Sequence, residues 1–114
     1  MKFLLSQYGD EKAMLAMPRE EAGRIHGAYM QYTQALQDAG VYITNTGLRP
    51  TCDARTVRTA HGKLVVTDGP FAETKEQFGG FYLIDVPDAD AAIEWAKKHP
   101  FTQFGAVEVR PVWG

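Results

Sequence analysis

The chain has 114 residues, 45% of them hydrophobic, and this suffices for one compact domain over residues 1–114 with its own core. Its 12 basic and 14 acidic residues give a formal charge of −2, so neither nucleic acid nor an anionic membrane is expected as a partner. The single cysteine, Cys52, excludes an internal disulfide and is typical of a reducing compartment, which predicts a cytoplasmic protein.

The first third of the chain reads as strand, helix, strand. Residues 2–8 form an apolar run that ends at turn residues, which predicts a first strand. Pro18 suits a first helical turn, and apolar residues then recur every three or four positions to Ala39, so a long helix is predicted. Gly40 suits the end of that helix, and residues 41–44 begin a second strand.

A β-hairpin is predicted in the middle of the chain. Residues 55–59 and 63–67 flank a short connection at His61-Gly62. With a two-residue loop, Ala60 faces Lys63 and the register continues to Arg55 opposite Asp68. This places an opposite-charge pair at the base of the hairpin.

The last third repeats the strand, helix, strand order. Residues 81–86 are rich in aromatic and branched side chains and predict a strand, and Asp88 is a good N-cap for a helix that ends before Pro100. Residues 107–113 alternate with period two and contain Pro111, which indicates an edge strand.

This order of elements predicts an α+β, ferredoxin-like fold, with an antiparallel sheet, two helices on one face and an inserted hairpin. The other sheet face would be too apolar for water, so a homodimer is predicted to cover it. The residues that are expected to make this sheet face apolar are Phe3, Leu5, Val65, Phe81, Leu83, Val107, Val109 and Trp113.

The run Asp68–Glu76, with the sequence DGPFAETKE, is the most distinctive motif of the chain. Asp, Gly and Pro make a tight, rigid turn after a strand, with Gly69 free to adopt positive φ. The motif resembles the signature of the DGPF subgroup of YCII-related proteins. Similar patches elsewhere extend the resemblance along most of the chain, at residues 2–5, 79–82, 92–96 and 107–111.

The resemblance implies a dimeric α/β barrel in a bacterial cytoplasm, and it names no substrate. In the broader YCII-related group, a helix histidine and an aspartate have been suggested as an acid/base pair at a cleft. Here the only histidine of the first helix is His26, and Asp38 follows it.

We select a small set of candidate site residues around this motif, henceforth the signature loop. His26 and Asp68 are the candidate catalytic residues, while His61 and His99 are explained by a turn and a helix end. The candidate ligand-binding residues combine carboxylates, a hydroxyl, cations and an aromatic ring, and they are Asp68, Phe71, Glu73, Thr74, Lys75 and Arg58. A purely structural role for the loop charges is equally consistent with the turn chemistry.

Two other kinds of site are considered in the sequence. Arg49, Arg55 and Arg58 could form an anion site, although exposed pairing with Asp53, Asp68 or Glu73 is the favoured interpretation. No metal site is predicted, because the three histidines and the cysteine are scattered, and no cofactor is implied.

Two functions therefore stay open at the level of sequence. In the first, a cytoplasmic dimer binds a small polar metabolite in a cleft near the signature loop, with possible acid/base catalysis. In the second, the protein is a non-catalytic regulatory or protein-docking module. The exposure of the loop charges discriminates them, because a catalytic carboxylate would lie in a cleft whereas a docking loop would expose its charges.

Overall fold

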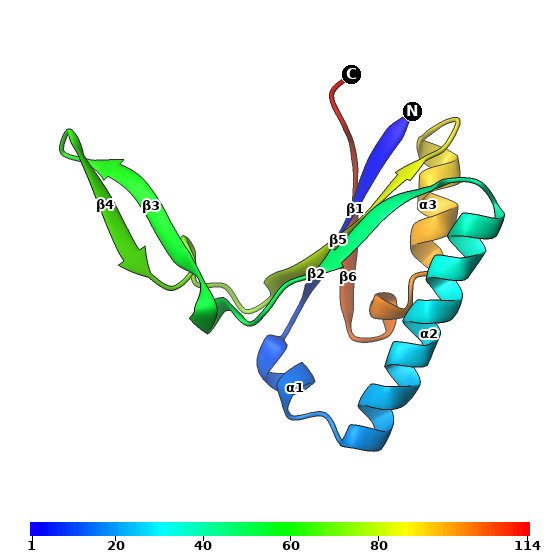
Figure 1. The fold of residues 1–114 in the computed structure, drawn as a ribbon, viewed down its shortest axis with the longest axis horizontal. Coiled ribbons are helices and arrows are strands. Elements are labelled where there is room, and N and C mark those ends of the chain that lie inside the picture. The colour runs from blue at the N-terminus through cyan, green and yellow to red at the C-terminus, as the bar shows by residue number, and fades with distance from the viewer.

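The computed structural model describes all residues from 1 to 114. Its elements run in the order β1 (Lys2–Gly9), α1 (Glu11–Leu15), α2 (Arg19–Asp38), β2 (Tyr42–Gly47), a 3₁₀ turn η1 (Thr51–Asp53), β3 (Arg55–Ala60), β4 (Lys63–Asp68), β5 (Gln77–Asp85), α3 (Ala89–Lys97), a 3₁₀ turn η2 (Pro100–Gln103) and β6 (Gly105–Pro111) (Figure 1).

Four strands form one antiparallel sheet in the order β2-β5-β1-β6, and β3 pairs only with β4. Both long helices, α2 and α3, lie on one side of this sheet (Figure 1). The predicted ferredoxin-like α+β fold with an inserted hairpin is therefore confirmed. None of the helices is long and apolar enough to cross a membrane.

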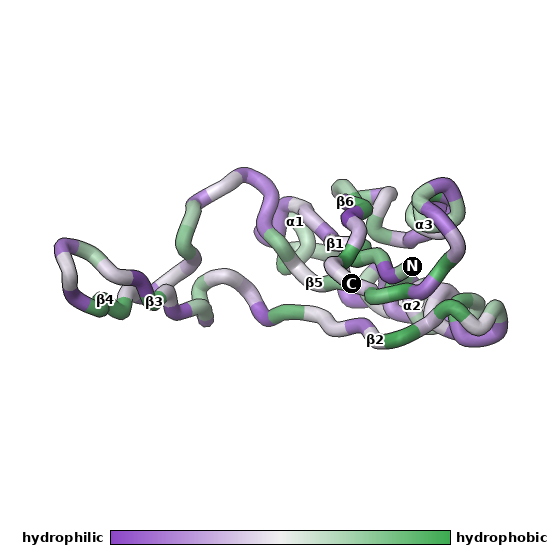
Figure 2. The backbone as a smooth tube through the Cα atoms, turned by 90° about the horizontal axis from the view of Figure 1, so that it is seen from above, coloured by the Kyte–Doolittle hydropathy of each residue, from purple (hydrophilic) through white to green (hydrophobic).

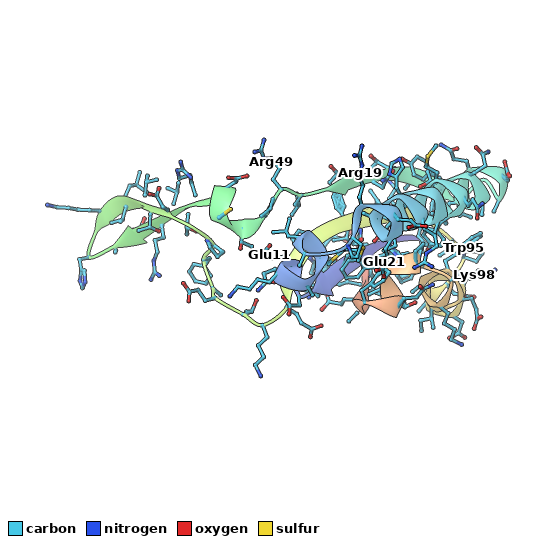
Figure 3. The ribbon with its side chains drawn as sticks, turned by 90° about the horizontal axis from the view of Figure 1, so that it is seen from below. Glu11, Arg19, Glu21, Arg49, Trp95 and Lys98 are labelled. Carbon is cyan, nitrogen blue, oxygen red and sulfur yellow. The ribbon has the colours of Figure 1, made fainter.

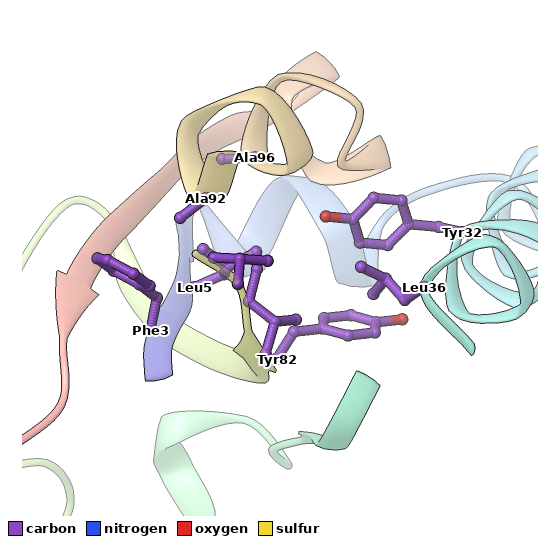
Figure 4. Close-up of a cluster of buried hydrophobic side chains, with 9 residues drawn as sticks. Phe3, Leu5, Tyr32, Leu36, Tyr82, Ala92 and Ala96 are labelled. Carbon is purple, nitrogen blue, oxygen red and sulfur yellow. The ribbon is translucent and has the colours of Figure 1, made fainter. Parts of the chain in front are cut away.

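The core lies between the sheet and the two long helices. Phe3 and Leu5 of β1 contact Tyr82 of β5, Leu36 of α2 and Ala92 of α3, all of them buried (Figure 4). Because side chains alternate across a strand, the residues between them, such as Leu4 and Leu83, point to the opposite face. We call this uncovered side the open face.

The sequence-based assignment of apolar residues to the open face was only partly right. Phe81 and Leu83 alternate with core residues of β5 and do lie there, half-buried. Four others pack in or against the core under the helices, and they are Phe3, Leu5, Val107 and Val109. Val65 lies on the hairpin and Trp113 is fully exposed beyond β6, so neither belongs to that face. The error arose because a period of two does not say which of the two faces the helices will cover.

Strand β5 begins four residues earlier than expected, at Gln77 instead of Phe81. The reason is a β-bulge, since Gln7 pairs with Gly80 while Tyr8 pairs with Phe78, and Gly79 is left as the extra residue. Gly80 has φ +154°, and a Cβ there would come within 2.5 Å of the Thr46 carbonyl oxygen. The two glycines therefore continue the strand instead of preceding it.

The hairpin has the expected register, with Ala60 opposite Lys63 and Arg55 opposite Asp68. The Arg55 Nε and Asp68 Oδ1 atoms lie 3.1 Å apart, which confirms the predicted charge pair at the hairpin base. His61 and Gly62 form the turn with positive φ. The hairpin projects from the side of the sheet that is opposite to the helices (Figures 1 and 2).

Replacing Gly80 with alanine should destabilise the fold, because the new Cβ would push against the backbone of β2. We expect Gly80→Ala to lower the free energy of unfolding by roughly 2 kcal/mol, measured by urea denaturation. Gly79→Ala is the matched control, since a Cβ at Gly79 meets no atom within 4 Å. Equal stabilities of the two variants would contradict the crowding at Gly80.

Candidate functional site

The largest cleft lies beside the signature loop, at the base of the hairpin. It has a volume of about 640 Å³ and is lined by Tyr8, Arg49, Thr74, Gln77 and Phe78, among others. Tyr8 and Phe78 face each other across β1 and β5 with ring centroids 5.6 Å apart. Tyr8 alternates with residues of the core, so this aromatic floor belongs to the open face of the sheet.

The rim of the signature-loop cleft is polar and internally bonded. Arg49 lies on the segment between β2 and the hairpin (Figure 3). Its Nε atom forms an ion pair of 2.9 Å with the Asp53 carboxylate. The favoured interpretation of exposed pairs therefore holds for Arg49 and Arg55, whereas Arg58 contacts the Phe71 ring instead of a carboxylate. The Thr74 hydroxyl donates to the Glu76 carbonyl oxygen at 2.6 Å, which fixes the end of the loop.

Glu11 ties three segments together beneath this cleft. Its carboxylate accepts hydrogen bonds from the backbone N–H and the hydroxyl of Thr51, at the start of η1. Its own N–H donates to the Gln77 Oε1 atom at 3.0 Å, and the Gln77 side-chain amide donates to the Thr74 carbonyl. The first turn of α1, the base of the hairpin and the end of the signature loop therefore hold one another.

A second cleft of about 480 Å³ lies between α2 and β2, and most of the residues that line it are polar. His26, Thr33 and Asn45 line it, together with Gln7 and Tyr29 from either side of the helix–sheet boundary. The Tyr29 hydroxyl donates to the Gln7 Oε1 atom at 2.6 Å. Burial raises the pKa of the Tyr29 phenol well above its usual value, so this group stays protonated at neutral pH.

A third and smaller cleft, of about 250 Å³, lies between α1, α2 and the sheet and adjoins the other two. It shares Arg49 and Gln77 with the signature-loop cleft. It shares Gln7 and Tyr29 with the cleft between α2 and β2. The three clefts thus follow one another around the end of the sheet where β1 stops and β5 begins.

The structure spreads the sequence-predicted site residues over separate places. Thr74 lines the signature-loop cleft and His26 lines the cleft between α2 and β2. Asp68 is 90% exposed in its pair with Arg55 and lines none of the three clefts. His26 and Asp68 are therefore not brought together within one chain, and Asp38 instead accepts a hydrogen bond from Gln34.

The remaining loop residues are exposed. Phe71 lies under the Arg58 guanidinium, whose carbon is 5.5 Å from the ring centroid, in a cation–π contact. Glu73 and Lys75 form no ion pair and point to solvent. No three His, Cys, Asp or Glu side chains lie close enough together to hold a metal ion.

His99 is the residue that the sequence analysis missed. It is only 1% exposed and packs against Tyr32, Tyr82 and Tyr29, with ring centroids between 4.9 and 5.6 Å away. Its Nδ1 atom accepts from the N–H of Phe101, so the neutral ring carries its proton on Nε2, which has no hydrogen-bond partner. Because His99 follows a helix, its position suggested a solvent-exposed helix end. Pro100 was the only residue nearby that indicated a turn of the chain back into the core.

The strand order and the one-sided helix layer define the chain as a ferredoxin-like α+β protein, with a polar and aromatic cleft at the end of its sheet. The chain belongs to the YCII-related domain family, whose model matches residues 1–114. The signature loop is compatible with the DGPF subgroup of that family.

Two known proteins are similar to this chain. An uncharacterized protein of Rhizobium meliloti (strain 1021) is 38% identical over 116 residues, which covers 98% of this chain and 92% of that protein. The solved structure of 5-chloro-2-hydroxyhydroquinone dehydrochlorinase from Burkholderia phenoliruptrix AC1100, in complex with 2,5-dihydroxybenzoquinone, has a TM-score of 0.51. It is 18% identical, the match covers 100% of this chain and 94% of that one, and the likeness shows the fold.

The buried His99 should make stability depend on pH. Burial lowers its pKa from 6.5 to about 4, so the folded protein resists a proton that the unfolded chain binds. The contribution of neutral His99 to the free energy of unfolding is fully present above pH 6.5. It is lost as the pH falls towards 4, by roughly 1.4 kcal/mol per pH unit within that window. Urea denaturation at pH 7.5 and 5.5 measures it.

His99→Asn should remove this part of the pH dependence while keeping a side-chain acceptor for the N–H of Phe101. His61→Asn is the control, because His61 is an exposed turn residue with φ +52° that asparagine tolerates. An unchanged pH dependence in His99→Asn would show that His99 titrates normally.

Proposed function

We propose that the protein is a homodimer, packed through the open faces of its two sheets, that binds a small polar molecule in the signature-loop cleft. The observation that carries the proposal is the position of the cleft, whose aromatic floor of Tyr8 and Phe78 belongs to the open face. A second copy on that face would close the cleft from above. We also propose a cytoplasmic setting in a bacterium, and the lone exposed Cys52 supports the reducing compartment.

The open face supports the dimer. Leu4 and Leu83 are direct cross-strand partners, and Phe81 lies beside them in the same layer, opposite Ser6. These side chains are covered by no helix, because α2 and α3 both lie on the other face. An apolar sheet face of this kind favours burial against another sheet.

The composition of the cleft supports a small ligand that carries both an apolar ring and polar groups. Tyr8 and Phe78 provide flat apolar surface, whereas Arg49, Thr74 and Gln77 provide polar atoms at the rim. The dehydrochlorinase of similar fold was solved with 2,5-dihydroxybenzoquinone, a small oxygenated ring compound. We infer that a ligand of that size and chemical class fits this cleft.

The geometry favours binding over acid/base catalysis. His26 and Asp68 line no common cleft, and the phenol of Tyr29 stays protonated, so it acts as a hydrogen-bond donor and not as a base. The roles of His26 and Asp68 in catalysis stay predictions, as do those of Phe71, Glu73, Lys75 and Arg58 in ligand binding.

One observation favours the alternative of a docking module. Asp68, Glu73 and Lys75 are all exposed, as expected of a loop that recognises another macromolecule through its charges. In that function the cleft would be a by-product of the hairpin base, and small molecules would not bind there. A ligand titration separates the two functions.

We expect 2,5-dihydroxybenzoquinone, used as a probe, to shift the backbone amide NMR signals of Leu48, Thr74 and Gln77, which all line the signature-loop cleft, in a saturable manner. Arg49→Met should weaken its binding roughly tenfold, because a charged hydrogen-bond donor at the rim is lost. Arg24→Met, on the outer surface of α2, is the matched control and should bind as the original protein does.

Shifts that are scattered over the surface, or equal binding by Arg49→Met and Arg24→Met, would overturn the assignment of the ligand to this cleft. A complete lack of binding by this probe and by other small hydroxylated rings would favour the docking function.

The dimer has its own test. Leu83→Lys places a charge on the open face and should raise the dimer dissociation constant by roughly tenfold or more, measured by sedimentation equilibrium. Ile93→Lys is the control, since Ile93 is an exposed apolar residue on α3, away from the open face. A dimer that tolerates Leu83→Lys as well as Ile93→Lys would not be packed through the sheets.

A further inference from the structure

The β3–β4 hairpin carries one apolar face that nothing in the chain covers. Val57 and Val66 are direct cross-strand partners, and Leu64 lies next to them opposite Thr59. The exposed fractions of the three apolar residues are 62%, 64% and 78%, respectively. Together they form a contiguous patch, which we call the arm face, flanked at the hairpin base by the Arg55–Asp68 pair.

The hairpin is isolated within its own chain. Its strands pair only with each other, and it is joined to the sheet at the hairpin base. A two-stranded hairpin on its own is marginally stable in water, because it has no third layer to bury its side chains. The opposite hairpin face is partly covered by the signature loop, through the Arg58–Phe71 contact and the bond from the Thr56 hydroxyl to the Gly69 carbonyl. The arm face has no such cover.

The chain exposes far more surface than a compact monomer of its size. Its accessible surface is 8082 Å², whereas a compact protein of 12.7 kDa has about 6,200 Å². Its radius of gyration is 16.1 Å, against about 13 Å for a compact domain of this length. The excess of about 1,900 Å² is more than twice the roughly 800 Å² that each partner buries in a standard interface.

This excess of accessible surface is large enough for an interface formed by both the open face and the hairpin. The four-stranded sheet and the hairpin lie at an angle to each other, with the hairpin on the open-face side (Figures 1 and 2). A body that packs on the open face is therefore flanked by the hairpin. An interface over both surfaces would bury an area typical of obligate homodimers, which bury well over 2,000 Å² in total.

Charge favours a second copy of this chain as the occupant. Residues 55–68 contain Arg55, Arg58 and Lys63 against Asp68, a net charge of +2. Since the whole chain has −2, the other 100 residues carry −4. A basic arm on an acidic body is complementary to another molecule of the same kind.

We propose that the β3–β4 hairpin is a dimerisation arm, which clasps the second copy of this chain and buries its arm face against it. The inference rests on the homodimer of the proposed function and deepens it. Because the hairpin base forms one wall of the signature-loop cleft, the partner that holds the arm also fixes the shape of that cleft.

Two neighbouring residues of β4 provide the test. Val66→Lys puts a charge on the arm face, whereas Thr67→Lys puts the same charge on the opposite face of the same strand, where the side chain is also exposed. We expect Val66→Lys to raise the dimer dissociation constant by roughly tenfold or more in sedimentation equilibrium, and Thr67→Lys to leave it within a factor of about three. Leu64→Lys should behave as Val66→Lys does.

Hydrogen exchange of the intact protein gives a second measurement. The amides of residues 55–68 should exchange slowly above the dissociation constant and fast after dilution below it, because only the dimer supports the hairpin. A dimer with a fast-exchanging hairpin, or one that is unaffected by both Val66→Lys and Leu64→Lys, would overturn the arm while leaving the sheet-to-sheet dimer intact. An original protein that is monomeric at micromolar concentration would overturn both.

Discussion

The central constraint on this structure is that its sheet is covered on one face only. Two helices suffice to bury Phe3, Leu5 and Tyr82, but both lie on the same side, so Leu4, Phe81 and Leu83 are left without a second layer. The one-sided helix cover also determines the position of the signature-loop cleft, because its aromatic floor continues the open face. A buried site there needs a second molecule as its roof.

Local features of the structure could be predicted from the sequence, because short-range rules determine them. The two-residue turn at His61-Gly62 sets the register of the hairpin and hence the pair of Arg55 with Asp68. Features that depend on distant segments could not. The bulge at Gly79 arises in the pairing of β5 with β1, the crowding at Gly80 comes from β2, and the burial of His99 follows from tyrosines some 17 to 70 residues away in the chain. Periodicity gave the two faces of each strand without saying which one the helices cover.

The predicted site at the signature loop stays a prediction, and the structure adds the geometry of a cleft beside that loop. Thr74 does line a cleft beside the signature loop, whereas the charges at Asp68, Glu73 and Lys75 point to solvent. Charged residues in a turn identify a loop as distinctive without showing where its side chains point. The residues that line the cleft, such as Tyr8 and Gln77, lie at strand ends. Tyrosine and glutamine are common there and form no recognisable sequence motif. The proposal of small-molecule binding therefore rests on the geometry of the cleft, whereas the family shows only the fold that builds it.

The Glu11 tie has a consequence for the behaviour of the molecule as a whole. It joins the first turn of α1 to η1 at the hairpin base, and Gln77 extends the same connection to the signature loop. A rotation of the hairpin about its base must therefore drag the walls of two adjoining clefts with it. In the proposed dimer, subunit pairing and occupancy of the cleft by a ligand are therefore thermodynamically linked, so that each changes the free energy of the other by the same amount. Such a linkage requires no dedicated hinge, since the side chain and the backbone N–H of one residue, Glu11, already connect the hairpin base to Gln77.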